Sequence, residues 1–82
     1  MSKVTMYGAD WCSDCRRSKA LLAAEGVEYE LKDVEHSAEF ASEAEQVSGR
    51  KSIPVIEFED GLVLVEPSDA DLRSALSERG LI

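Results

Sequence analysis

Two cysteines three residues apart, in the stretch Trp11-Cys12-Ser13-Asp14-Cys15, restrict the fold of this chain more than any other feature. The segment before them, from Lys3 to Tyr7, predicts a short strand, and the segment from Cys12 to Glu25 has apolar residues at helical spacing. Cys12 is therefore expected where a loop enters a helix, beside backbone N–H groups that have no partner within the helix. The positive end of the helix dipole at that point favours a thiolate.

Cys15 follows one helical turn later on the same face, so a disulfide with Cys12 can close while the Cys15 sulfur stays less exposed. We interpret Cys12 as the attacking thiol and Cys15 as the resolving thiol. A zinc site needs two further ligands, and the chain has no other cysteine and one histidine, His36, so we expect no metal site. A structural disulfide within one helical turn would close a very short loop and restrain little of the unfolded chain. Redox catalysis is the remaining interpretation.

The rest of the chain supplies five further elements. Residues 27–31 alternate as a strand with one buried face, after Gly26 ends the first helix. A second helix over 37–47, ended by Gly49, places four apolar residues on one face: Phe40, Ala41, Ala44 and Val47. The runs VIEFE and LVLVE flank Asp60-Gly61, a strong hairpin signal, and a last helix runs from a capping sequence at Ser68 to Gly80. The order is β-α-β-α-β-β-α in one domain, residues 1–82.

Two features of this pattern stay open. Residues 62–65 are apolar at every position, so that strand is either covered on both faces or partly exposed at an interface. The glutamates of the second helix, and His36 near its start, are interpreted as solvated residues.

Length, charge and hydropathy exclude several classes of function. A chain of 82 residues has room for one domain, and its hydrophobic fraction of 44% is that of an ordinary globular protein. The net charge of −8 argues against binding to nucleic acid, which is driven by basic residues. No apolar run approaches the length of a membrane span, and residues 1–9 lack the pattern of a signal peptide. We therefore expect a cytosolic protein.

Several of these motifs together resemble a known family. WCSDC at a helix start, SIP before an Asp-Gly hairpin and DL in a last helix are similar to the glutaredoxin branch of the thioredoxin-like fold. Within that branch the chain most resembles the mycoredoxins, actinobacterial proteins that work with mycothiol. The shared features are a tryptophan before the first cysteine, Arg16-Arg17 after the second, the turn Asp33 to His36, and Pro67-Ser68 before the last helix.

The resemblance implies an α/β thioredoxin-like fold, with a four-stranded mixed sheet flanked by three helices, and thiol–disulfide oxidoreductase activity. It also implies that the peptide bond before Pro54 is cis, that Pro54 faces the redox pair, and that the backbone of Ile53 pairs with the substrate chain like an added strand. Cys12 and Cys15 are the expected catalytic residues. The expected substrate-binding residues are Trp11, Asp14, Lys51, Ile53, Pro54, Ser68 and Asp69.

The chain departs from the glutaredoxins that use glutathione. These typically have a lysine three residues before the first cysteine, a tyrosine between the cysteines and a Gly-Gly before the last helix, where this chain has Ala9, Asp14 and Glu66-Pro67-Ser68. Mycothiol is neutral apart from its thiol, so a site edged by Asp10, Asp14 and Glu66 would repel anionic glutathione and accept mycothiol. Asp14 could equally be an acid favoured in the first helical turn.

Trp11 is open to two interpretations: it either shields Cys12 and offers an apolar surface to the substrate, or fills space under the loop. The expected function is reduction of protein–mycothiol mixed disulfides by a monomer. Mycothiol, or glutathione, serves as co-substrate, and no cofactor is tightly bound. One alternative is a dithiol redoxin recycled by a flavin reductase as a hydrogen donor. Another is a carrier dimer that bridges a [2Fe–2S] cluster without turnover.

Overall fold

The computed structural model describes residues 3–82, and within that range the helices and strands follow the predicted order β-α-β-α-β-β-α. Met1 and Ser2, part of the N-terminal stretch considered above for targeting, lie outside the described residues. The elements are β1 (Val4–Gly8), α1 (Ser13–Ala24), β2 (Glu30–Asp33), α2 (Ala38–Ser48), β3 (Val55–Phe58), β4 (Val63–Val65) and α3 (Asp69–Glu78). None of these helices has the length and apolar character needed to cross a membrane.

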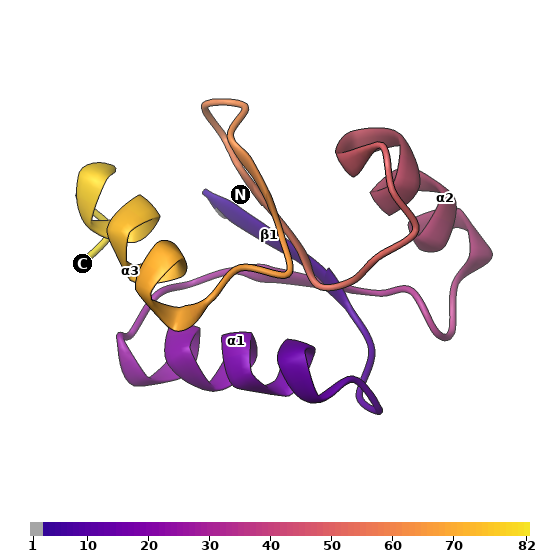
Figure 1. The fold of residues 1–82 in the computed structure, drawn as a ribbon, viewed down its shortest axis with the longest axis horizontal. Coiled ribbons are helices and arrows are strands. Elements are labelled where there is room, and N and C mark those ends of the chain that lie inside the picture. The colour runs from indigo at the N-terminus through magenta and orange to yellow at the C-terminus, as the bar shows by residue number, and fades with distance from the viewer. Residues whose placement is uncertain (1–2) are drawn as a thin grey trace.

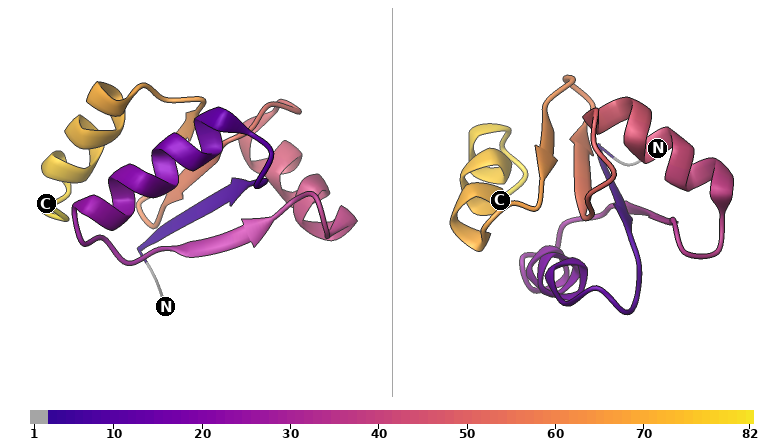
Figure 2. Two further views of the ribbon diagram at one scale, coloured as in Figure 1. Left: turned by 90° about the horizontal axis from the view of Figure 1, so that it is seen from below. Right: turned by 45° about the vertical axis from the view of Figure 1, so that its right-hand side comes forward.

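The four strands form one mixed sheet in the order β2-β1-β3-β4. β1 pairs with β2 in parallel, and the pairs β1–β3 and β3–β4 are antiparallel. Helices α1 and α3 lie on one side of the sheet and α2 lies on the other (Figure 1; Figure 2, right). The C-terminal end of β1 therefore leads through a short loop directly into the N-terminus of α1, where the two cysteines lie.

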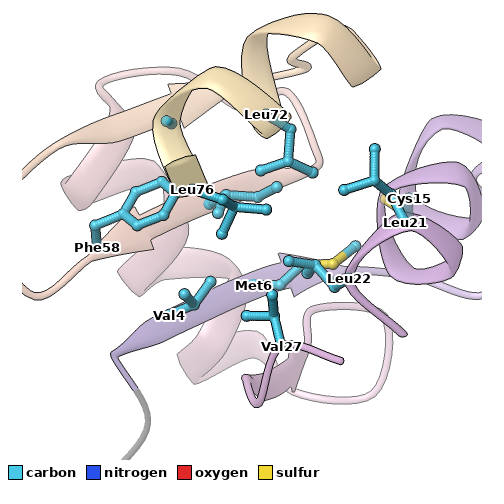
Figure 3. Packing of buried hydrophobic residues seen from close by; sticks show 11 residues of the cluster. Val4, Met6, Cys15, Leu21, Leu22, Val27, Phe58, Leu72 and Leu76 are labelled. Atoms are coloured by element: carbon cyan, nitrogen blue, oxygen red, sulfur yellow. The ribbon is translucent and has the colours of Figure 1, made fainter. Parts of the chain in front are cut away.

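The two faces of the sheet have separate apolar clusters, because successive side chains of a strand point to opposite faces. The larger cluster lies under α1 and α3 and includes Cys15 (Figure 3). Its buried members are Val4, Met6, Cys15, Leu21, Leu22, Val27, Ile56, Phe58, Leu72, Ala75 and Leu76. The smaller cluster lies under α2 and is centred on Tyr7, Ala44 and Val55.

The structure resolves the open question about residues 62–65. Leu62 and Leu64 pack against the larger cluster, whereas Val63 and Val65 pack against the smaller one. β4 thus has apolar contacts on both faces, but it lies at the edge of the sheet and all of its residues are only half-buried. Partial cover on both faces explains the uninterrupted apolar pattern.

The prediction for the second strand was partly wrong. The strand begins at Glu30 and not at Val27, because the Val27 N–H donates to the carbonyl of Leu22 at 2.9 Å and so completes the end of α1. Val27 is buried and Tyr29 half-buried as expected, but Leu31 is 43% exposed. Leu31 pairs with buried Met6 on an edge strand, where the sheet provides a neighbour on one side only.

The predicted buried face of α2 also needs correction. Ala44 is the one buried residue of this helix, Phe40 and Val47 are half-buried, and Ala41 is exposed. Glu43, expected on the solvated side, is half-buried and its carboxylate lies 2.9 Å from Lys32 Nζ. The salt bridge turns this part of the helix toward β2, which periodicity alone does not predict.

The predicted ends of the helices are confirmed by their hydrogen bonds. Ser37 Oγ accepts from the N–H of Phe40 at the start of α2, and Ser68 Oγ accepts from the N–H of Asp71 at the start of α3. Gly49 ends α2 in the left-handed region with φ 75°. These caps satisfy backbone groups that have no partner within the helix.

Helix α1 lies against β1 at a glycine. A Cβ atom added to Gly8 would lie 3.0 Å from Cys15 Sγ and 3.3 Å from Cys15 Cβ. The absence of a side chain at Gly8 therefore allows α1 to approach the strand at this point, and this close approach places Cys15 in the core.

Replacing Gly8 with alanine is expected to lower the free energy of unfolding by about 1 to 3 kcal/mol, because the added methyl group would overlap the Cys15 side chain. Urea unfolding would measure the loss. In a Cys15→Ala background the cost of Gly8→Ala should fall, since the sulfur is absent. Gly26→Ala, whose new Cβ would have no atom within 4 Å, should cost the same in both backgrounds. An undiminished cost of Gly8→Ala without Cys15 would contradict this account.

Candidate active site

The sulfur of Cys12 caps the N-terminus of α1. Cys12 is the N-cap residue, with φ −84° and ψ 116°, and its Sγ accepts a hydrogen bond from the N–H of Cys15 at 3.2 Å. The Cys12 N–H in turn donates to the carbonyl of Ala9 at 3.2 Å, which shapes the loop. A donor N–H and the positive end of the helix dipole both stabilise negative charge on this sulfur. The predicted placement of Cys12 at the helix entry is confirmed.

Cys15 has a different environment. Its side chain is completely buried, whereas Cys12 is half-buried, and both cysteines are free thiols. Burial, and to a lesser degree the hydrogen bond with Cys12, raises the pKa of the Cys15 thiol to about 12. Cys15 therefore remains a neutral thiol near pH 7, and Cys12 is the cysteine that a substrate can reach.

The loop before β3 faces the cysteines. The peptide bond between Ile53 and Pro54 is cis, as the resemblance implied, and the Ile53 carbonyl lies 4.0 Å from Cys12 Sγ, within reach of a weak S–H···O hydrogen bond. Pro54 itself is buried, and its carbonyl accepts from the N–H of Glu66 at 2.9 Å. This bond ties the turn after β4 to the loop beside Cys12.

A shallow cavity surrounds Cys12. Its lining comes from three segments: the start of α1, the loop before β3 and the turn after β4. The lining residues are Trp11, Cys12, Ser13, Asp14, Lys51, Ser52, Ile53 and Glu66. Four of the predicted substrate-binding residues, Trp11, Asp14, Lys51 and Ile53, are thus brought together with Cys12, whereas Pro54 is buried and does not line the cavity.

Trp11 is 66% exposed. Its side chain therefore does not fill space under the loop, and it presents an apolar surface at the edge of the cavity beside Cys12. Of the two interpretations of this residue, exposure favours the one in which it contacts a substrate.

Ser68 and Asp69 do not line the cavity, and the structure gives each a different contact. Ser68 caps α3, and Asp69 Oδ1 lies 3.5 Å from Arg17 Nε. Arg17 also approaches Asp14, with 3.4 Å between Nη2 and Oδ1, so one guanidinium bridges two carboxylates from α1 and α3. The charge of Asp14 is therefore partly compensated. Substrate contacts of Ser68 and Asp69 stay predictions.

The acidic residue before Trp11 lies outside the cavity. Asp10 is exposed, its carboxylate lies 3.4 Å from Lys19 Nζ, and its carbonyl accepts from Arg16 at 3.4 Å. Arg16 and Lys19 thus hold the loop against α1. Asp10 contributes to the field around the site without bordering it.

The turn from Asp33 to His36 has a structural role that its sequence did not reveal. Asp33 Oδ1 accepts from the N–H groups of Glu35 and His36 at 2.8 and 3.3 Å, and Asp33 Oδ2 lies 2.8 Å from His36 Nδ1. This pairing lowers the pKa of Asp33 below its ordinary value and raises the pKa of His36. His36 is exposed, as expected, and the turn fixes the connection between β2 and α2.

Sequence reasoning missed Gly8 as part of the site, and it placed Glu66 at the edge of the site without predicting the backbone conformation of that residue. Gly8 leaves the space in which Cys15 packs against β1. The one sequence signal for this role was a glycine at the end of the first strand. Glu66 borders the cavity with φ 49°, the one positive φ of a non-glycine residue in the part of the chain that the structure describes. The left-handed region disfavours side chains, by roughly 1 to 2 kcal/mol. No local sequence pattern signals such a conformation at a glutamate.

Comparisons with known proteins identify the family of this chain. The sequence model of the glutaredoxin family matches residues 4–63. Mycoredoxin 1 of Corynebacterium glutamicum is 34% identical over 73 residues, which covers 88% of this chain and 90% of that protein. A glutaredoxin of Neisseria meningitidis serogroup B is 41% identical over 58 residues, covering 68% of this chain and 67% of its own length.

A solved structure shows the same fold. The crystal structure of a glutaredoxin from Archaeoglobus fulgidus superposes with a TM-score of 0.79 at 26% identity, covering 90% of this chain and 85% of that chain. The predicted α/β thioredoxin-like fold is confirmed. The chain belongs to the glutaredoxin family of thiol–disulfide oxidoreductases.

Proposed function

We propose that this protein reduces mixed disulfides between proteins and mycothiol, with Cys12 as the nucleophile. The Cys12 thiolate attacks the mycothiol sulfur, the disulfide bond breaks, and the protein thiolate leaves and takes up a proton. A second mycothiol thiolate then attacks the mycothiol sulfur bound to Cys12. Cys12 leaves as a thiolate and mycothiol disulfide is released, so the protein ends the cycle in its starting redox state.

The contrast between the two cysteines carries this proposal. Cys12 is accessible and its sulfur accepts an N–H at a helix terminus, whereas Cys15 is buried with its pKa raised to about 12. A thiol that stays protonated near neutral pH is a poor nucleophile. The arrangement therefore supports a route that needs Cys12 alone. Attack by Cys15 on a mixed disulfide at Cys12 is a slower second route.

Charge around the cavity supports mycothiol as the small thiol. Asp14 and Glu66 border the cavity from two sides, and Lys51 is the one cation among its described lining residues. Arg17 partly compensates Asp14, but Glu66 has no ion pair with any residue in the range 3–82. Glutathione carries two carboxylates, whereas mycothiol is neutral apart from its thiol. Mycoredoxin 1 of Corynebacterium glutamicum is similar to this chain over most of its length, which supports the resemblance to mycoredoxins noted in the sequence.

The loop before Pro54 is the proposed place for the protein part of the substrate. Ile53 lies beside Cys12 and outside the sheet, and within residues 3–82 its backbone has no backbone hydrogen-bond partner. An extended substrate chain can pair with these free groups as an added strand. This pairing would place the mixed disulfide beside Cys12 Sγ, with Trp11 against its apolar atoms.

The remaining expectations form part of the same proposal. We propose that residues 1–82 act as a single domain and as a monomer in the cytosol, where two free thiols stay reduced. The partners are mycothiol and proteins that carry it as a mixed disulfide. The excess of carboxylates, with a net charge of −8, opposes nucleic acid as a partner.

Single cysteine variants test the nucleophile. With mycothiol as reductant, Cys12→Ser should abolish turnover of a mycothiol mixed disulfide, because serine does not form a thiolate. Cys15→Ser should retain at least about half of the wild-type kcat/KM, since its buried thiol is not needed for the monothiol route. Comparable losses in both variants would overturn that route, and activity that survives Cys12→Ser would refute the nucleophile.

Carboxylate variants test the proposed selectivity for mycothiol over glutathione. The ratio of kcat/KM for mycothiol over glutathione mixed disulfides should fall about threefold to fivefold in Glu66→Gln. That range corresponds to the loss of one repulsion of about 1 kcal/mol across roughly 7 Å at an effective dielectric near 40. Asp14→Asn should shift the ratio less, because Arg17 already compensates this charge. Glu59→Gln, on the hairpin outside the cavity, serves as control. Ratios that stay unchanged in both site variants would refute electrostatic selection.

A further inference from the structure

A second hollow continues from the cavity around Cys12. It lies between α2 and residues 50–53, and it shares Lys51, Ser52 and Ile53 with the active-site cavity. We call this hollow the α2 groove. Val34 and Ala44 provide apolar lining, and Glu45, Arg50 and Lys51 provide its charges. A chain bound at Ile53 can therefore extend from Cys12 into the α2 groove along one continuous surface.

The two cations of the α2 groove differ from most other cations of this protein in having no ion pair in the part of the chain that the structure describes. Within residues 3–82, neither Arg50 nor Lys51 has a carboxylate within ion-pair distance. Most of the other cations are paired: Arg17, Lys19, Lys32, Arg73 and Arg79. Both groove cations are exposed, in a chain whose net charge is −8. The α2 groove therefore offers unpaired positive charge beside the nucleophile, on a surface that is otherwise mostly acidic.

Hydrogen bonds hold the start of this loop in place. The Ser48 hydroxyl donates to the carbonyl of Ala44 at 2.8 Å, its Oγ lies 3.0 Å from the carbonyl of Arg50, and it accepts from the N–H of Arg50 at 3.1 Å. Gly49 turns the chain at the end of α2 in the left-handed conformation. The backbone of Arg50 is thus fixed against the helix, and its side chain starts from a defined position at the groove.

We propose that the α2 groove binds an acidic segment of the protein partner, next to the cysteine that forms the mixed disulfide. The inference rests on the proposed function, since it names the class of protein substrate that the same site accepts. The partner's carboxylates pair with Arg50 and Lys51, and an apolar side chain between them contacts Val34 and Ala44. Glu45 opposes the acidic segment and limits its affinity.

Charge at this groove also fixes how a partner approaches. An acidic partner is repelled by most of this surface and attracted to the two adjacent unpaired cations of the α2 groove, so encounter favours the orientation in which its cysteine meets Cys12. The gain is greatest at low ionic strength, because the Debye length falls from about 30 Å at 0.01 M salt to about 10 Å at 0.1 M.

The test uses two peptides that differ only in charge. Each carries one cysteine as a mixed disulfide with mycothiol, flanked by aspartates in one peptide and by asparagines in the other. The measured quantity is the ratio of kcat/KM for the aspartate peptide over the asparagine peptide at low salt. We expect about fivefold for the wild type, and a ratio near or below one for Arg50→Glu. Glu45→Gln should raise the ratio about twofold.

Lys3→Glu is the matched control, because it makes the same change in net charge at the far end of β1 and should keep the wild-type ratio. At high salt the wild-type ratio should approach one. Equal rates on both peptides in the wild type, or a preference that survives Arg50→Glu, would overturn the proposal.

Two further measurements distinguish a failure of this inference from a failure of the proposed function. Turnover of a mixed disulfide between mycothiol and mercaptoethanol, which has no peptide chain, tests the reaction alone, and its absence would refute the proposed function. Binding of the reduced peptides to the Cys12→Ser variant, followed by NMR, tests the groove without turnover. Tighter binding of the aspartate peptide, with amide shifts at residues 50–53, would support the groove, whereas equal binding would refute it.

Discussion

The hydrogen bond from the Cys15 N–H to Cys12 Sγ joins the start of α1 to the chemistry of the site. In α2 and α3 the same capping position is held by the hydroxyl oxygens of Ser37 and Ser68. In α1 the cap is a sulfur, so the atom that satisfies the helix terminus is also the proposed nucleophile. A thiolate is a better acceptor than a thiol, and the geometry that starts the helix therefore also favours the reactive form of Cys12.

The position of α1 gives the two cysteines unlike environments although they are three residues apart. Gly8 lets the helix approach β1 closely, which buries Cys15 against the strand and raises its pKa to about 12. Cys12, one turn earlier, is half-buried, and its Sγ lies 4.0 Å from the Ile53 carbonyl. The different environments of the two cysteines thus follow from one close contact between a helix and a strand, and they need no further charged group.

Much of this could be predicted from the sequence, because it depends on local patterns. The helix caps, the Asp60-Gly61 hairpin and the entry of Cys12 into α1 all follow from neighbouring residues. The late start of β2 and the exposure of Leu31 could not, since they depend on how α1 ends and on which strand lies at the edge of the sheet. The contact between Arg17 and Asp69 could not be predicted either, since it joins α1 to α3, two helices that are distant in sequence.

Glu66 has a side chain in a backbone conformation that disfavours side chains. A glycine would adopt φ 49° without cost, and the N–H of Glu66 would make the same bond to the Pro54 carbonyl, since that bond involves no side chain. Neither the conformation nor the contact therefore requires a glutamate. The carboxylate has no ion pair within residues 3–82, and it borders the cavity that contains Cys12. An unpaired charge held in a strained conformation beside Cys12 is better explained by the proposed effect on a bound thiol than by stability.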